Sequence, residues 1–181
     1  MKRIHKDQRG LTIIELLVVI VLTALITTAI TTTFFQVFNM NIRTTNHMSA
    51  LSQVQQAGKL VSEDILQAQE IEDDPAGGEF LILGWNSTGQ THEVTYTVED
   101  GELWRSESID GGGATMTRVA EYINPIETDC CCDCNSDGYC DVGCDCNGAV
   151  VIFTVTATVG EGTVHEESEQ RIYRVQPRPG T

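Results

Sequence analysis

The apolar positions of this 181-residue chain fall into three patterns that follow one another along the sequence. In the first pattern, residues 11–38 are almost all apolar or Thr. As a helix with a rise of 1.5 Å per residue, this segment would span about 42 Å. The hydrocarbon core of a bilayer is about 30 Å thick, so residues 11–38 are predicted to form a transmembrane helix.

The second pattern has a helical period and covers residues 39–72. Apolar or small side chains recur every three or four residues and form one narrow stripe, which predicts an amphipathic helix. Its members are Leu51, Val54, Gly58, Val61, Ile65 and Ala68. Residues 73–78, which contain Pro and two Gly, end this helix. We expect the stripe to pack on a sheet of the same chain.

The third pattern, over residues 79–176, is typical of short antiparallel strands. Residues 92–98 alternate between apolar and polar, and Glu99-Asp100-Gly101 then supplies a tight turn into residues 102–105, which predicts a hairpin. The other candidate strands are residues 80–85, 149–159 and 171–175. A helix followed by antiparallel strands indicates an α+β fold, with a long N-terminal helix packed on an antiparallel sheet.

Charge is distributed unevenly around the apolar segment. The formal net charge is −15, yet residues 1–10 carry four basic residues against one Asp, so they are net +3 and the remainder is −18. Basic residues before a membrane span keep the N-terminus in the cytoplasm and send the C-terminus outside. So acidic a body is unsuited to nucleic acid, because phosphate contacts need Lys and Arg.

Glu15 interrupts the apolar segment near its start. A carboxylate costs roughly 2.5–3.5 kcal/mol at the centre of a membrane helix on insertion scales. A cleaved secretory signal has a shorter apolar region of about 7–15 residues and a small-residue cleavage site, which residues 27–29 match poorly. An uncleaved anchor accounts for the length and the orientation. Neither alternative explains the acid.

The segment from Arg9 to Ile20, RGLTIIELLVVI, resembles the N-terminal signature of type IV pilins and type II secretion pseudopilins. In that family a basic leader ends in Gly, and a Glu follows five residues later in an apolar helix. A prepilin peptidase cuts after the Gly and methylates the new N-terminus. The resemblance implies a leader of residues 1–10, cleavage between Gly10 and Leu11, and methylation of Leu11, where the family usually has Phe or Met.

The resemblance also implies a role for Glu15. Cleavage leaves an ammonium on Leu11, four residues earlier, and residues i and i+4 share a helix face. We expect the carboxylate to meet the ammonium of a neighbouring subunit and to set the register of assembly, because a buried charge is costly without a partner. The implied partners are other pilins or pseudopilins, the prepilin peptidase and an inner-membrane assembly platform. The implied location is the inner membrane, then a periplasmic or cell-surface filament.

A second resemblance covers residues 50–120. The order of helix, Trp85 strand, Tyr96 strand and a turn into Leu103-Trp104-Arg105 is similar to minor pilins of the PilW and pseudopilin J type. It implies a low-abundance subunit that helps to initiate the filament or form its tip. A major pilin remains an alternative. The sequence does not indicate which machine the subunit serves.

All seven cysteines fall in an insertion at residues 129–148, rich in Cys and Asp. They are Cys130, Cys131, Cys132, Cys134, Cys140, Cys144 and Cys146, and this density indicates disulfides or metal in an exported protein. At most three bridges can form within one chain. Pairing of the first three cysteines with the last three would close a tight loop between them.

The same insertion contains the pattern D-x-N-x-D-G, which matches the start of an EF-hand-type calcium loop. The candidate ligands are Asp133, Asn135, Asp137, the Tyr139 carbonyl, Asp141 and Asp145. Position 12, where the loop needs a bidentate Glu, is Cys144. Three interpretations stay open: disulfides without metal, Ca²⁺ in a disulfide-braced loop, and thiolate binding of zinc or an iron–sulfur cluster.

Catalytic signatures are missing from the sequence. It has no G-x-S-x-G, P-loop, dinucleotide glycine pattern, H-E-x-x-H or C-x-x-C, and the four histidines are scattered. We therefore predict that the protein is not an enzyme. The predicted function is that of a minor pilin or pseudopilin, a structural filament subunit. The alternative is a membrane-anchored extracellular calcium-binding module that does not enter a filament.

Overall fold

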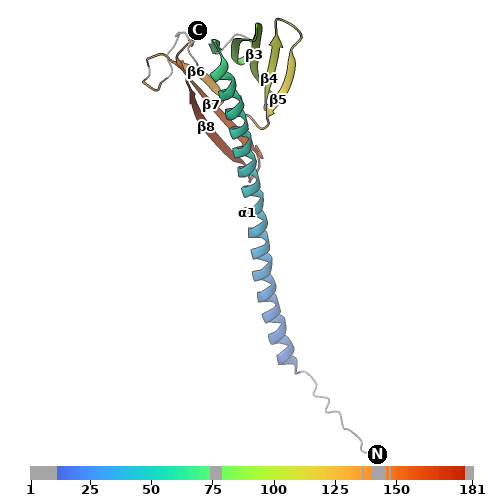
Figure 1. The fold of residues 1–181 in the computed structure, drawn as a ribbon. Coiled ribbons are helices and arrows are strands. Elements are labelled where there is room, and N and C mark those ends of the chain that lie inside the picture. Colours follow the sequence, from blue (N-terminus) through green and yellow to red (C-terminus); the bar gives the residue numbers. More distant parts are fainter. Residues whose placement is uncertain (1–11, 74–78, 136, 140–145, 147, 178–181) are drawn as a thin grey trace, which may run out of the picture. The chain divides into compact units, whose positions relative to one another are not determined.

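The computed structural model describes residues 12–73, 79–135, 137–139, 146 and 148–177. Among these residues, one long helix, α1, runs from Ile13 to Gln67, and eight strands follow it (Figure 1). The chain divides into two compact units, residues 1–42 and residues 43–181, and α1 contributes to both. The predicted α+β class, with a long N-terminal helix and antiparallel strands, is confirmed.

In the first unit, every described side chain of α1 is exposed. By length and composition this helix can cross a membrane, as the apolar pattern of residues 11–38 predicted. Its threonine hydroxyls bond back to the preceding turn: Thr27 Oγ1 donates to the Thr23 carbonyl at 2.8 Å, and Thr31 Oγ1 to the Thr27 carbonyl at 2.8 Å. These internal bonds let hydroxyls lie in an apolar surround without an unpaired donor.

The second unit contains two antiparallel sheets where a single sheet was expected. The five-stranded sheet has the order β1-β2-β3-β4-β5 and the three-stranded sheet the order β6-β7-β8. The bounds of the first are β1 Glu70–Asp73, β2 Glu79–Ser87, β3 Gln90–Glu99, β4 Glu102–Ile109 and β5 Thr115–Ala120. Those of the second are β6 Asp129–Asp133, β7 Val150–Val159 and β8 Glu167–Val175.

The predicted hairpin is confirmed as β3 and β4, in which Glu99 pairs with Glu102. Asp100 and Gly101 both have positive φ, 51° and 75°. Two such residues form the tight turn whose twist matches that of paired strands.

Two predicted boundaries differ from the structure. The helix was expected to reach residue 72, but it ends at Gln67, and Ile71 lies in β1 opposite Leu83. The backbone N–H of Gln69 already donates to the Gly84 carbonyl at 2.8 Å, so strand pairing replaces the next helical turn. The insertion was expected to start as a loop at Asp129, but Asp129–Asp133 is β6, paired with β7.

The apolar stripe of α1 packs within its own chain, as expected. Five of its six members are buried, and Leu51 is half-buried. One hydrophobic core joins this face of the helix to both sheets, with Val61 from α1, Leu83 from β2 and Phe153 from β7. The stripe therefore anchors residues 50–68 to the globular unit.

Two specific contacts fix the helix against the sheets. Towards the first sheet, the buried carboxylate of Asp64 accepts hydrogen bonds from the Tyr96 hydroxyl at 2.6 Å and from Arg105 Nε at 2.7 Å. Towards the second, the Tyr173 hydroxyl donates to the Val54 carbonyl at 3.0 Å, and its ring lies over Gly58. The sequence pattern included Gly58 in the buried face of the helix, but it did not include Asp64.

Candidate functional site

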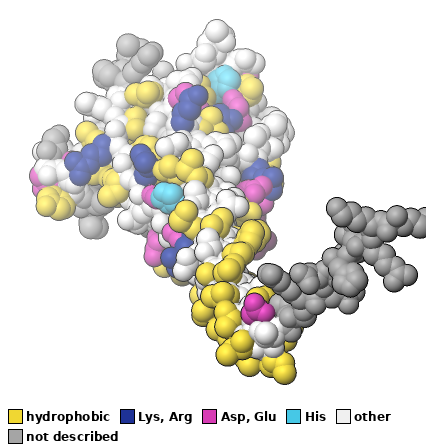
Figure 2. Space-filling view, turned by 90° about the horizontal axis from the view of Figure 1, so that it is seen from below, with side chains coloured by type: hydrophobic (Ala, Val, Ile, Leu, Met, Phe, Trp, Pro, Cys, Tyr) yellow, Lys and Arg dark blue, Asp and Glu magenta, His cyan; other side chains and the backbone are white. Residues whose placement is uncertain are grey.

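The N-terminal candidate site begins at the edge of the described residues. Gly10 and Leu11, the predicted cleavage and methylation positions, lie outside them. Glu15 lies in the first turn of α1. Exposed hydrophobic side chains gather on this part of the molecule (Figure 2). Glu15 is exposed, so its carboxylate is accessible for contact with another molecule.

Thr12 and Glu15 form a reciprocal cap at the start of α1. Glu15 Oε2 accepts hydrogen bonds from the backbone N–H of Thr12 at 3.1 Å and from its hydroxyl at 2.9 Å, and the Thr12 Oγ1 accepts from the Glu15 N–H at 3.4 Å. This is the capping box, in which side chains satisfy N–H groups that the first helical turn leaves unpaired. The role predicted for Glu15 from the sequence did not involve Thr12, although the T-x-x-E spacing is the sequence signal of a capping box.

The cap gives Glu15 a partner within its own chain. A carboxylate beside the first turn also interacts favourably with the helix dipole. Both accepted bonds use one oxygen, Oε2, and the donors are a neutral amide and a neutral hydroxyl. An ammonium would make a stronger, charge-assisted bond with the same carboxylate. The arrangement therefore holds the acid in place while leaving it able to bind a cation.

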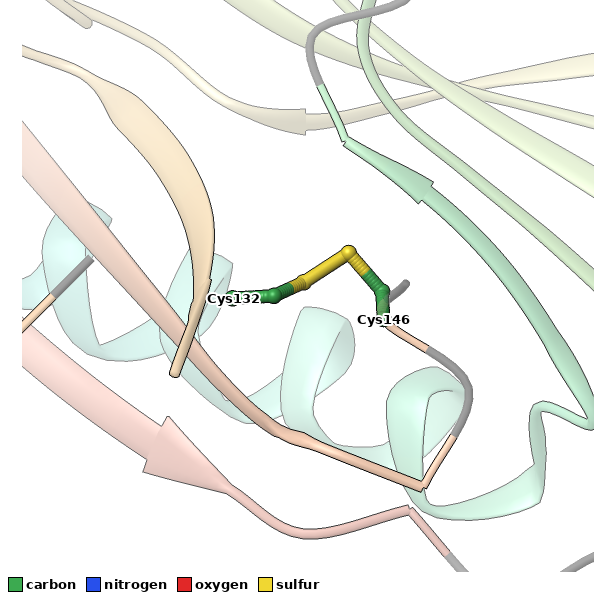
Figure 3. Close-up of a disulfide and its surroundings, with 2 residues drawn as sticks. All are labelled: Cys132 and Cys146. Carbon is green, nitrogen blue, oxygen red and sulfur yellow. A yellow bond between two sulfur atoms is a disulfide. The ribbon is translucent and has the colours of Figure 1, made fainter. Parts of the chain in front are cut away.

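The second candidate site is the Cys- and Asp-rich segment. Cys132 in β6 and Cys146 form a disulfide with a Cα–Cα distance of 5.4 Å (Figure 3). Both residues are buried in the core that α1 and the two sheets share. This disulfide therefore links β6 to the segment before β7 inside the core, so it stabilises the sheet region as well as the loop.

The other cysteines differ in part from the expected pairing. Cys131 and Cys134 are also disulfide-bonded, whereas Cys134 was outside the expected set of three neighbours. Successive side chains of a strand point to opposite faces. Accordingly, Cys130 and Cys132 are buried while Cys131 is half-buried, so three adjacent cysteines of β6 cannot all face one loop. Cys140 and Cys144 lie outside the described residues.

The disulfides limit which cysteines could bind zinc or an iron–sulfur cluster as thiolates. Four of the seven cysteines, Cys131, Cys132, Cys134 and Cys146, are in disulfides. A disulfide sulfur is not a thiolate, and a four-thiolate zinc or iron–sulfur site needs four of them. These four cysteines therefore do not supply thiolates to a metal. Within the described part of the chain, no group of three or more His, Cys, Asp or Glu side chains could hold a metal ion.

The D-x-N-x-D-G segment begins at Asp133, the last residue of β6, and its described residues form local hydrogen bonds. Asp133 Oδ2 accepts from the Gly138 N–H at 2.8 Å, Asn135 Oδ1 from the Asp137 N–H at 2.9 Å, and Asp137 Oδ1 from the Tyr139 N–H at 2.9 Å. Gly138 has φ of 90°, which favours glycine. The structure thus brings the first four predicted ligand residues into one turn; Asp141 and Asp145 lie outside the described residues.

Comparison with known proteins identifies the N-terminal segment. Residues 5–31 match the prokaryotic N-terminal methylation motif. A search of curated proteins and a search of solved structures each found no significant match. The chain thus combines a prepilin-type N-terminal signal with a pilin-like α+β fold, in which a long helix packs against antiparallel sheets.

Proposed function

We propose that this protein is a non-enzymatic filament subunit, a minor pilin or pseudopilin of a type IV pilus-like or type II secretion assembly. The observation that carries this proposal is a helix with exposed apolar side chains from Ile13 to Phe38, whose first part lies within the methylation motif of residues 5–31. The motif implies processing by a prepilin peptidase and assembly with other pilins. Structural roles are typical of such proteins.

A helix with this much exposed apolar surface must be surrounded by lipid or by other apolar side chains. Burial contributes about 25 cal/mol per Å² of apolar surface, so a helix bare on every face is unstable in water. Before assembly the inner membrane would supply the cover, with the globular unit outside. In a filament, equivalent helices of neighbouring subunits would replace the lipid. The same helix thus serves as anchor and as filament core.

Glu15 would exchange partners between these two states. In the single chain its carboxylate is held by Thr12. In the filament it would bind the Leu11 ammonium of a neighbouring subunit inside an apolar bundle. A buried charge that lacks its partner is strongly destabilising, so only one register of neighbouring helices would be stable.

The minor-subunit assignment has separate support. The strands that bear Trp85, Tyr96 and Trp104 are consecutive in one sheet as β2, β3 and β4, joined to α1 through Asp64. This is the order of elements that resembles PilW-type minor pilins and pseudopilin J. It favours a place near the filament tip, in the complex that starts assembly.

Processing is tested by replacing Gly10 with Leu. The peptidase must accommodate the residue before the cut, so the variant should stay as full-length precursor in the membrane. Gln8→Ala, also in the leader, is the control and should be cut normally. The readout is the intact mass, which for the processed protein lacks residues 1–10 and carries one additional methyl group. A mature protein that retains Met1 would instead favour the alternative, a membrane-anchored module outside any filament.

Assembly is tested by Glu15→Val together with Thr12→Ala. Both variants should be processed, because cutting depends on Gly10. Thr12→Ala removes the capping hydroxyl but retains the carboxylate, so it should enter sheared filaments. Glu15→Val should fail to enter them, since it has no group to bind the neighbouring ammonium. Normal incorporation of Glu15→Val would refute the role in register, and equal loss in both variants would assign Glu15 to capping alone.

A further inference from the structure

Asp133 carries a buried carboxylate oxygen that the fold does not satisfy. The residue ends β6 and is only 4% exposed. Its Oδ2 accepts from the Gly138 N–H, whereas its Oδ1 is buried and has no hydrogen-bond partner among the described residues. A buried polar atom left unsatisfied is destabilising, and more so when it is charged. An oxygen in this state is available to bind a cation.

The surrounding turn presents further oxygens on the same short segment. Asn135 and Asp137 each use their Oδ1 to accept a backbone N–H two residues on, which fixes both side chains close to the backbone of the turn. The positive φ of Gly138 lets the chain reverse at the sixth position of the pattern. In an EF-hand-type loop, positions 1, 3 and 5 supply side-chain oxygens and position 7 supplies a carbonyl.

We propose that this turn binds one Ca²⁺ ion through Asp133 Oδ1, the side-chain oxygens of Asn135 and Asp137, and the Tyr139 carbonyl. Hard oxygen ligands of this kind suit Ca²⁺. The ion binds the buried Asp133 Oδ1, which accepts no hydrogen bond from a described residue. This proposal is independent of the filament role, because it concerns residues of the globular unit alone.

The disulfides restrain the turn even when no ion is bound. Cys132 and Cys134, the two neighbours of Asp133, are both disulfide-bonded, and Cys132 is fully buried. A segment restrained in this way has little conformational entropy left to lose on binding. Arg174 Nη2 donates to the Gly138 carbonyl at 3.2 Å, so the guanidinium occupies an oxygen that is not among the proposed ligands.

Terbium luminescence on the oxidised full-length chain in detergent tests the proposal. Tb³⁺ replaces Ca²⁺ at oxygen sites, and excited Tyr139 lies next to the proposed ion. We expect saturable luminescence that added Ca²⁺ displaces, with a Ca²⁺ dissociation constant in the range of about 10⁻⁴–10⁻³ M that extracellular modules show. Tyr139→Leu should lose most of the luminescence yet retain Ca²⁺ binding by calorimetry, because the ligand is its carbonyl.

Carboxylate variants locate the site. Asp137→Asn, at an exposed position, should weaken Ca²⁺ binding about tenfold or more, since affinity follows ligand charge. Asp133→Asn should do the same, and Asp137→Asn keeps the test valid if Asp133→Asn does not fold. Asp129→Asn is the matched control and should bind like the parent, since Asp129 Oδ1 accepts the N–H of Cys130 and Asp129 is not among the proposed ligands. Absence of saturable binding in the parent, or equal affinity in Asp137→Asn, would overturn the proposal.

Discussion

Gly58→Ala tests how α1 docks on the second sheet. In an isolated helix this change is stabilising by about 0.8–1.0 kcal/mol, because Gly loses more backbone entropy than Ala. Here an added Cβ would lie 1.9 Å from Tyr173 Cζ and 2.3 Å from its hydroxyl oxygen. Carbon atoms prefer a separation of about 3.5–4.0 Å, so the ring would have to move.

Two interactions hold that ring in place. The Tyr173 hydroxyl bonds to the Val54 carbonyl at 3.0 Å, and the ring stacks on Phe153 with centroids 4.9 Å apart. The hydrogen bond is worth about 0.5–1.5 kcal/mol and the aromatic pair about 0.5–1.5 kcal/mol. Overpacking of a core usually costs about 1–3 kcal/mol. When the gain in helix propensity is subtracted from this cost, Gly58→Ala should lower the free energy of unfolding by up to about 2 kcal/mol.

The measurement is urea unfolding of the full chain in detergent, followed by tryptophan fluorescence. Ser52→Ala, on the exposed face of α1, is the control and should raise the free energy of unfolding by a few tenths of a kcal/mol. When Tyr173→Ala has removed the ring, Gly58→Ala should become stabilising by up to about 1 kcal/mol. A Gly58→Ala variant as stable as Ser52→Ala in the parent background would refute the steric argument.

Three further predictions concern the globular unit. Tyr96→Phe removes a hydroxyl that donates to a buried helix carboxylate, so urea unfolding should show a loss of about 1–3 kcal/mol, and an unchanged midpoint would contradict this. Replacing the Cys132–Cys146 bridge, with a separation of 14 residues, by Cys132→Ala with Cys146→Ala should cost about 3 kcal/mol, and urea unfolding without reductant would match the parent if the bridge were dispensable. The hydrogen bond from Arg105 lowers the pKa of Glu107, so this stabilisation is present above the ordinary Glu pKa of about 4.3 and is lost as the pH falls through the lower folded-state pKa. Glu107→Gln should therefore lose less stability on acidification than the parent, and identical pH profiles would exclude the linkage.

Local rules explain why several features were predictable from the sequence. The methylation motif is a contiguous signal, and residues 5–31 match it. The Asp100-Gly101 turn follows from two residues that tolerate positive φ, and the buried stripe from a period of three and four. The D-x-N-x-D-G turn is equally local, since each of its hydrogen bonds spans two to five residues. Each of these features depends on neighbours along the chain.

Only the tertiary structure decided the contacts between distant residues. Asp64 and Arg105 lie 41 positions apart, and no period identifies either as the partner of the other. The division into two sheets and the early end of α1 depend on which strand reaches which edge. The pairing of Cys132 with Cys146 depends on strand faces, because adjacent cysteines of β6 point to opposite faces of the sheet. Such pairings are stabilised by packing and hydrogen bonds that form only when the whole unit folds, so the sequence of one segment does not determine them.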